Sequence, residues 1–360
     1  MAMDLVKRAL DLQPYPNPMN YSYLDKDVFG NPNLPENPKL SICLITYKHA
    51  SYIRTCLDNI LSQEVNFSYE ILLGEDHSPD ETASIVAEYA TQHPTKIKAF
   101  IRPENVGGKA NFLHCFLQCR GEYVIFIEGD DYWTDNTKLQ QQVDFLDTHP
   151  HASACFHNAE IVYEDESGRP NENINSTDQA TWTNTSDLVT EKEAWFMATA
   201  SVMMRRQYVS TLPDWFVDCK SGDIPMYVIL AEKGPIGYIN KCMSVYRKNL
   251  GGQSFTDNTK SKEFIQNRMF MYSKINEYTA FKYNQAIRNI LGEYHLLLIN
   301  CLEHKSAPIK KIYHLFVAYF MFNELSFRKF KWLVRDNLIS TESTLAYLNF
   351  RSKINRLIGR

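Results

Sequence analysis

Three features are missing from the sequence: paired cysteines, a long apolar run and a signal peptide. Its eight cysteines form no Cys-x-x-Cys pair, which excludes a paired-cysteine zinc site and a dense disulfide framework and favours a reducing environment. No apolar run reaches the ~18 residues that a membrane-spanning helix needs. The first residues carry neither the charged nor the apolar region of a signal peptide. We therefore expect a cytoplasmic protein.

The sequence also has little net charge, with 38 Lys and Arg residues against 42 Asp and Glu residues. A balance of -4 gives no indication of a nucleic-acid partner. The exception is the stretch from Lys305 to Arg360, which contains 11 basic residues and 3 acidic ones. Apolar residues interleave with the basic ones there, as in helices that lie on anionic membranes. Peripheral contact with the inner face of the membrane is one interpretation. A helical region that packs on the core and exposes a basic face is the other.

Short apolar runs alternate with helical spacing in the first third of the chain. The pattern predicts strands at 40–46, 69–73, 97–101 and 123–128, and helices at 51–63, 82–92 and 109–119. Such alternation indicates βαβ units and a mostly parallel, Rossmann-like sheet of the α/β class, flanked by helices. Ligands bind at the carboxyl ends of such strands. We therefore expect one crevice to collect the polar residues that follow the four strands.

The chain is predicted to have three parts: an arm, an α/β domain and a helical region. Its 360 residues suffice for roughly two domains. Residues 1–39 are rich in Pro and Asn and are predicted to be an irregular arm. The α/β domain is predicted to extend over 40–255, with an irregular insertion at 164–186. From 256 to 360 the pattern is helical and basic.

The most informative segment is Glu128-Gly129-Asp130-Asp131, which follows the strand at 123–128. Carboxylates crowded at a buried strand end are costly unless a cation lies among them. Hard oxygen ligands suit Mg²⁺ or Mn²⁺, which in turn bind phosphates. Asp130 and Asp131 are the predicted metal ligands, and Glu128 projects to the same side as Asp130. A solvated acidic turn is the simpler alternative.

Two other strand ends carry groups that suit a nucleotide. Glu75 and Asp76 lie at the end of the second strand, where a carboxylate could accept the imide hydrogen of a pyrimidine, while Ser78 or Asp80 could cap the next helix. Further on, Asn105-Val106-Gly107-Gly108-Lys109 places two glycines and a lysine at a helix start, which favours an anion. This segment is neither a P-loop nor a dinucleotide fingerprint.

Two segments in the second half complete the candidate site. Asp223 stands between Gly222 and a helix that starts near Pro225, so it is either an N-cap or a general base. Arg247 and Lys248 precede Gly251-Gly252, and these two cations either balance a diphosphate or belong to a solvated turn.

Taken in order, these motifs resemble glycosyltransferase family 2, the inverting nucleotide-sugar transferases of the GT-A fold, over about residues 39–255. The family's strand end Thr-Tyr corresponds to Thr46-Tyr47, and its acidic turn corresponds to Glu75-Asp76-His77-Ser78-Pro79-Asp80. Its Asn-x-Gly, Asp-x-Asp-Asp, Gly-Asp and Tyr-Arg motifs correspond to Asn105-Val106-Gly107, Glu128-Gly129-Asp130-Asp131, Gly222-Asp223 and Tyr246-Arg247. The resemblance implies a set of nucleotide-sugar-binding residues: Thr46, Tyr47, Glu75, Asp76, Ser78, Asn105, Gly107, Lys109, Glu128, Asp131, Arg247 and Lys248.

The resemblance further implies the reaction. Asp223 would act as the base that deprotonates an acceptor hydroxyl, and Mn²⁺ or Mg²⁺ on Asp130 and Asp131 would stabilise the departing nucleotide diphosphate. The expected donor is a UDP-linked hexose or N-acetylhexosamine, and the expected acceptor is a glycan or lipid-linked glycan, as in surface polysaccharide synthesis. Two departures from the family pattern concern the metal. Glu128 replaces the first Asp of the Asp-x-Asp-Asp motif. Asn249 stands where many members have a His, in the tail that runs from Tyr246-Arg247 to Gly251-Gly252.

Two other classes remain as alternatives. A sugar-phosphate nucleotidyltransferase also binds a nucleotide and magnesium on a parallel sheet, but it needs a glycine-rich basic loop after the first strand. This chain has Thr46-Tyr47-Lys48-His49 at that position. The second alternative is a non-catalytic carbohydrate-binding protein with a transferase-like fold.

Overall fold

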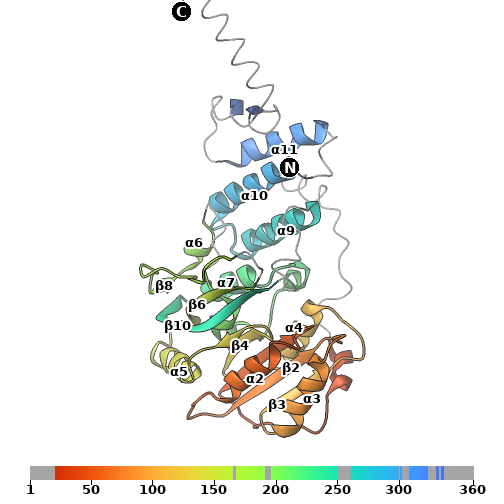
Figure 1. The fold of residues 1–360 in the computed structure, drawn as a ribbon. Helices are drawn as coiled ribbons and strands as arrows, with labels where there is room; N and C mark the ends of the chain where they lie inside the picture. Colours follow the sequence, from red (N-terminus) through yellow and green to blue (C-terminus); the bar gives the residue numbers. More distant parts are fainter. Residues whose placement is uncertain are drawn as a thin grey trace, which may run out of the picture. The chain divides into compact units, whose positions relative to one another are not determined.

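A computed structural model describes residues 21–164, 168–190, 196–249, 261–299, 301, 308–322, 330–331 and 334–335. The chain divides into two compact units. One is an α/β unit, described between residues 21 and 249 apart from short gaps, and the other is a helical unit, described from residue 261 onward and at Val189 and Thr190. Figure 1 shows the elements of both.

Within the described residues, ten strands of the α/β unit form one sheet with the path order β3-β2-β1-β4-β9-β6-β10-β5. Its first half is parallel and consists of β1 (Leu40–Thr46), β2 (Tyr69–Glu75), β3 (Ile97–Ile101) and β4 (Tyr123–Glu128). The predicted α/β class with a mostly parallel core is therefore confirmed.

The second half of the sheet is mixed. Strand β9 (Met203–Arg205) runs antiparallel to β4 and to β6 (Ala154–Glu164), and the long β10 (Ile236–Asn249) is parallel to β6. Strand β5 (Tyr132–Trp133) pairs antiparallel with β10. The insertion predicted to be irregular contains short strands β7 (Glu172–Asn173) and β8 (Trp182–Thr183), which pair with β6 and β10. Two-residue strands carry too few side chains to produce a periodic signal.

Helices cover both faces of the parallel half. On one face α2 (Ile53–Leu61), α3 (Thr82–Gln92) and α5 (Lys138–Thr148) pack on side chains such as Ile42 and Leu44. On the other face lies α4 (Gly108–Leu117), where the Cys43 thiol contacts the Phe112 carbonyl. Alternate residues of β1 thus point to opposite layers, as the pleat requires. Short segments complete this unit: α6 (Thr185–Leu188), α7 (Asp223–Ala231), η1 (Ser22–Asp27), η2 (Thr199–Ser201), η3 (Arg206–Tyr208) and η4 (Asp214–Asp218).

The described part of the N-terminal arm is fastened to the sheet by one buried arginine. Arg102 follows β3 and is 2% exposed. Its guanidinium donates to the Leu24 carbonyl at 3.1 Å, to Asp27 Oδ2 at 3.2 Å and to Asn111 Oδ1 at 3.2 Å. Val28 also forms a bridge to Phe100 on β3. Residues 1–20 of the predicted arm lie outside the described residues.

The helical unit contains α9 (Lys262–Tyr278), α10 (Asn284–Ile299) and α11 (Pro308–Met321). Helix α10 packs between the other two. Gly292 lets it approach Phe322 closely, because a Cβ there would lie 2.9 Å from the phenyl ring. Among the described residues, no helix combines the length and apolar character needed to cross a bilayer.

Candidate active site

The parallel strands end at one edge of the sheet, and their register brings the polar segments together. Thr46 is level with Glu75, and Ile45 is level with Glu128. The backbone continues this alignment past the strands, since Asp76 N donates to the Thr46 carbonyl at 3.1 Å and Gly129 N donates to the Ile45 carbonyl at 2.9 Å. The candidate active site therefore begins at the carboxyl ends of β1, β2 and β4.

The acidic pair after β4 is held by the end of β10. Asn249 Nδ2 donates to Asp130 Oδ2 at 3.0 Å, and Arg247 N donates to Asp131 Oδ1 at 3.0 Å. Arg247 Nη1 also donates to the Asp130 carbonyl at 3.1 Å. Asp130 and Asp131 are 8% and 2% exposed, so this is a buried cluster rather than a solvated acidic turn.

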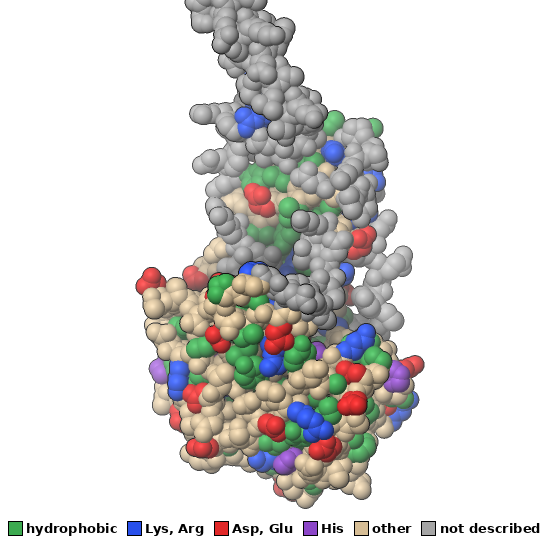
Figure 2. Space-filling model, viewed as in Figure 1, with side chains coloured by type: hydrophobic (Ala, Val, Ile, Leu, Met, Phe, Trp, Pro, Cys, Tyr) green, Lys and Arg blue, Asp and Glu red, His purple; other side chains and the backbone are tan. Residues whose placement is uncertain are grey.

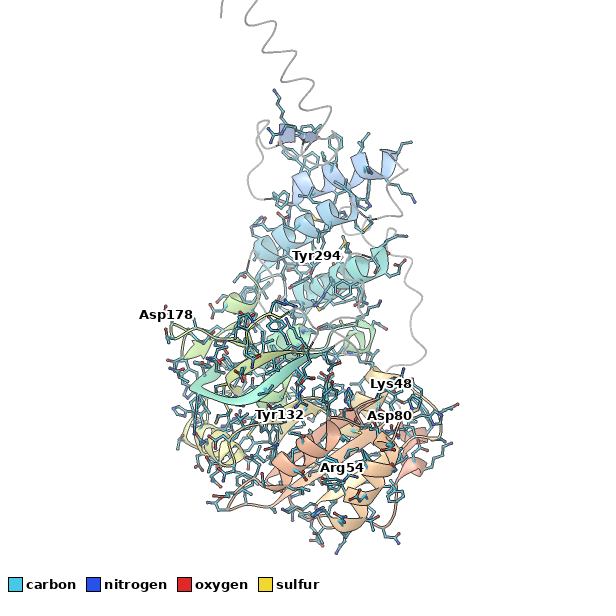
Figure 3. All side chains as sticks on the ribbon, viewed as in Figure 1. Lys48, Arg54, Asp80, Tyr132, Asp178 and Tyr294 are labelled. Atoms are coloured by element: carbon cyan, nitrogen blue, oxygen red, sulfur yellow. The ribbon has the colours of Figure 1, made fainter. Side chains whose placement is uncertain are left out.

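Aromatic rings fix the arginine of this cluster. The Arg247 guanidinium lies 4.6 Å from the ring centroid of Tyr132 and 4.9 Å from that of Tyr52. Its Nε lies 3.2 Å from Glu164 Oε1. Figure 3 labels Tyr132, which stands on the short strand β5 just after the acidic pair. Lys248 lies instead with its Nζ 5.4 Å from the Tyr163 ring. Gly251 and Gly252 of the predicted tail lie outside the described residues.

Burial and mutual repulsion perturb the carboxyl groups of this cluster. Burial, and then the charges of Asp130 and Asp223, raise the pKa of Glu128 to about 8. Burial, and then Asp130 and Glu128, raise the pKa of Asp131 well above its ordinary value. A cation among these groups would offset the repulsion and favour their charged forms.

Several buried polar atoms at this point have no hydrogen-bond partner within the described part of the chain, namely Thr46 Oγ1, His49 Nδ1 and Asp131 Oδ2. His49 Nε2 lies 3.8 Å from Asp130 Oδ2. Among the described residues no three His, Cys, Asp or Glu side chains lie close enough to hold a metal ion. The carboxylates of Asp130 and Asp131 are hard oxygen ligands, which suit Mn²⁺ or Mg²⁺ together with substrate phosphates.

The loops after β2 and β3 form a second, neighbouring part of the site. Asp76 Oδ1 accepts from Val106 N at 2.7 Å, and Asn105 Nδ2 donates to the Asp76 carbonyl at 2.9 Å. Burial raises the pKa of Asp76, although the backbone amides of Val106 and Gly107 oppose the shift. These contacts unite the predicted Asp76, Asn105 and Gly107.

The loop after β1 joins the same group. Glu75 Oε1 accepts from Ser78 N at 2.8 Å, and Ser78 Oγ accepts from Lys48 N at 3.0 Å. Asp80 accepts from the backbone amides of Ala50 and Thr82, so it ties this loop to the start of α3. Figure 3 shows Lys48 and Asp80 close together at this edge. The Tyr47 ring is 39% exposed there, with Lys48 Nζ 5.0 Å from its centroid. Glu75 and Ser78 thus shape the loop.

Asp223 is the first residue of α7, and Gly222 is the N-cap. The carboxylate is near enough to Glu128, Lys109 and Tyr227 to perturb the pKa of each group. The predicted base and the acidic cluster, 92 to 95 residues apart in the sequence, are therefore neighbours in the structure. Lys109 lies beside α7 as well, with its Nζ 4.9 Å from the Phe216 ring centroid.

A family model described as glycosyl transferase family 2 matches residues 41–212. This region of the chain belongs to glycosyltransferase family 2. This confirms the resemblance and accounts for the parallel strands, the acidic turn after β2 and the acidic cluster after β4 in one matched region.

Three comparisons place this family member among known proteins. An uncharacterized protein of Mycobacterium tuberculosis is 33% identical over 236 residues, and the chain spans 64% of that relative's length. The poly(ribitol-phosphate) beta-N-acetylglucosaminyltransferase TarS of Staphylococcus aureus is 30% identical over 113 residues, which are 31% of this chain and 19% of TarS. The crystal structure of S. aureus TarS 1-349 in complex with UDP-GlcNAc is 18% identical, with a TM-score of 0.55 over 79% of this chain and 81% of that one. This last likeness shows the GT-A fold.

The sequence analysis of this family 2 member missed three site residues. His49, Tyr52 and Tyr132 carry no metal or nucleotide spacing of their own. His49 was detectable only by its place, three residues after the strand end at Thr46. The two tyrosines flank Arg247 because β5 pairs with β10, and no local pattern predicts that pairing.

Proposed function

We propose that this protein is a metal-dependent inverting glycosyltransferase. It moves a sugar from a nucleotide-diphosphate sugar, with UDP as the expected nucleotide, to a hydroxyl group of a glycan or lipid-linked glycan. The observation that carries the proposal is the meeting of two groups at one sheet edge: the buried pair Asp130 and Asp131, and the separate carboxylate Asp223 on α7. The pair Asp130 and Asp131 could hold a cation with the donor diphosphate, and Asp223 could act as the general base.

The proposed reaction is a single displacement. Asp223 accepts the proton of the acceptor hydroxyl as that oxygen bonds to the anomeric carbon, and the bond from that carbon to the diphosphate oxygen breaks. Asp130 and Asp131 would hold Mn²⁺ or Mg²⁺, with His49 and Asn249 alongside, and the ion would neutralise charge that develops on the diphosphate. Asn249 Nδ2 donates to Asp130 Oδ2 at 3.0 Å, and rotation of the amide would turn its oxygen toward the ion.

The donor is the finer part of the proposal. Asp76 lies 2.7 Å from Val106 N at the β2 end, where a uracil imide would find a carboxylate acceptor. The donor sugar is proposed to be a hexose or an N-acetylhexosamine, and the TarS structure of similar fold contains one such UDP-linked sugar, UDP-GlcNAc. Surface polysaccharide synthesis is the proposed setting.

A donor screen tests this function. Purified protein is incubated with UDP-, GDP-, dTDP- and CMP-linked sugars and Mn²⁺, and released nucleotide is measured together with the anomeric configuration of any product by NMR. We expect nucleoside diphosphate release from a UDP-sugar and inversion at the anomeric carbon. Pyrophosphate formation from sugar phosphate and UTP would indicate a nucleotidyltransferase instead. Tight sugar binding without turnover would indicate a carbohydrate-binding protein.

We further propose that α11 contacts an anionic membrane, which suits a lipid-linked acceptor. Ile309, Ile312, Phe316 and Phe320 follow each other at helical spacing and are 82%, 46%, 45% and 57% exposed. Lys310 and Lys311 stand beside this apolar row. Exposed apolar and basic residues on one short helix are typical of interfacial binding.

Co-sedimentation with phosphatidylglycerol liposomes tests the membrane contact. Wild-type protein should bind at low salt and release at high salt, since screening weakens the attraction. Phe316→Ser and Phe320→Ser together should abolish binding to liposomes. Equal binding to purely zwitterionic liposomes, or no binding by wild type, would contradict the proposal.

A further inference from the structure

A lysine at the start of one helix reaches the start of another. Helix α4 begins at Gly108, after Gly107 in the left-handed conformation with φ 86°. From the second position of this helix, the Lys109 side chain extends to the N-terminus of α7. A Cβ placed on Gly222 would lie 3.5 Å from Lys109 Nζ. Because Gly222 directly precedes Asp223, the ammonium lies against the turn that presents the proposed base.

Several charged and titratable groups surround Asp223. Glu128 at the end of β4 and Tyr227 on α7 both interact with it electrostatically, and so does Lys109 from α4. Lys109 in turn interacts with Cys219, which follows η4. Of the groups named here from the described part of the chain, Lys109 is the cation. The α7 N-terminus adds partial positive charge on the same side.

A carboxylate base beside a diphosphate must stay negatively charged although other negative groups lie nearby. The charge of Glu128, when ionised, and that of the donor diphosphate both favour a protonated Asp223, which cannot accept a proton. A nearby ammonium has the opposite effect. Burial lowers the pKa of Lys109, while Cys219 and Asp223 oppose that shift, as expected of a buried cation near acidic groups.

We propose that Lys109 is a positioning residue for the general base and, from its place beside Gly222, keeps Asp223 in its charged carboxylate form. This inference rests on the proposed function. It assigns Lys109 to the acceptor side of the site, whereas the sequence motif alone suggested the donor phosphates. Lys109 itself neither donates nor accepts the transferred proton in this account.

The pH dependence of transfer tests the assignment. Lys109 favours the charged carboxylate and so lowers the pKa of Asp223, and its removal should raise that pKa. In Lys109→Met, the acidic limb of the kcat/KM profile for acceptor should move to higher pH by on the order of one unit. Lys109→Arg should restore the wild-type limb. Lys233→Met removes an exposed cation beyond the other end of α7 and should leave the profile unchanged.

Two readouts keep the outcomes distinct. Titration of [¹³C-γ]Asp-labelled protein by NMR, with Asp223→Asn to assign the signal, measures the carboxyl group without any transfer assay. A raised titration midpoint in Lys109→Met supports the proposal even if the donor or acceptor has been chosen wrongly. Calorimetry with UDP and Mn²⁺ measures whether Lys109 contributes to donor affinity instead. An unchanged Asp223 titration together with a tenfold or greater loss of UDP affinity would place Lys109 on the donor phosphates and overturn the proposal.

Discussion

At the scale of single residues, the acidic cluster owes its form to partners far away in the sequence. Asp130 and Asp131 are adjacent to each other, but Asn249 and Arg247 hold them across a separation of 116 to 119 residues. The carboxylates were predictable because their local crowding is costly without a cation. Arg247 was predictable from its motif. The direct contact between Asn249 and Asp130 was not predictable, since it depends on where β10 ends.

Asp130→Asn tests the metal at this scale. The amide keeps the shape of the side chain but removes the charge, so we expect Mn²⁺ affinity in the presence of UDP to fall at least tenfold, as measured by electron paramagnetic resonance. Transfer should fall by a factor of about 10² or more, because a developing charge would lose its stabilisation. Glu81→Gln, a change of the same kind at the exposed N-cap of α3, serves as the matched control. Unchanged Mn²⁺ binding by Asp130→Asn would remove Asp130 from the metal site.

Arg102→Met tests the fastening of the arm. The substitution leaves Asp27, whose side chain is 4% exposed, as a buried charge without its arginine. Breaking such a pair on one side typically costs about 3–5 kcal/mol, and urea unfolding should show a loss of that size. The control is Arg54→Met on α2, because Arg54 and Glu88 form an ion pair at 2.6 Å with side chains 50% and 42% exposed. That change should cost far less stability than Arg102→Met, because an exposed ion pair is screened by water. Similar losses for both variants would contradict the assignment.

At the scale of elements, strands and helices in the parallel half follow the local pattern closely. The predicted bounds of β3, β4 and α3 coincide with those in the structure, because a strand buried on both faces gives an uninterrupted apolar run. The second half was harder to predict. Strand β10 shifts register against β6 between Ile239 and Cys242 and again before Ser244, and such irregularities leave no regular alternation to detect.

The contact between α10 and α11 contains a buried histidine pair with a testable pH dependence. His295 Nδ1 and His314 Nδ1 lie 2.8 Å apart. Burial, and then His314, lower the pKa of His295 to about 3. In the unfolded chain the pKa is near 6.5, so the unfolded state binds the proton more tightly and acid favours unfolding.

We therefore expect the helical unit to lose stability as the pH falls below about 6.5 toward 3. Between pH 7 and pH 5 the loss should be about 2 kcal/mol, measured by hydrogen exchange of α10 amides. His295→Gln should show a flatter dependence over this range, whatever its absolute stability. An equal slope in both proteins would show that this pair is not the cause.

At the scale of the whole molecule, charge is distributed unevenly along the chain. Figure 2 shows acidic and basic side chains interspersed over the visible face of that unit. The excess of basic residues lies in the segment from Lys305 to Arg360. This division agrees with a donor site in one unit and a surface-binding role for the other, and it was predictable from composition alone. The direction in which Lys109 extends toward α7 could not be predicted from the sequence, because it depends on the packing of two helices 115 residues apart.

The central claim is that Asp223 is the base of a sugar transfer to a donor held at Asp130 and Asp131. The most direct measurement is single-turnover transfer by Asp223→Asn beside calorimetric binding of the same UDP-sugar with Mn²⁺. We predict that transfer falls by about 10²–10⁴-fold, as for removal of a general base, while the donor dissociation constant changes less than about threefold. Transfer near the wild-type rate, or a parallel collapse of donor binding, would contradict the account.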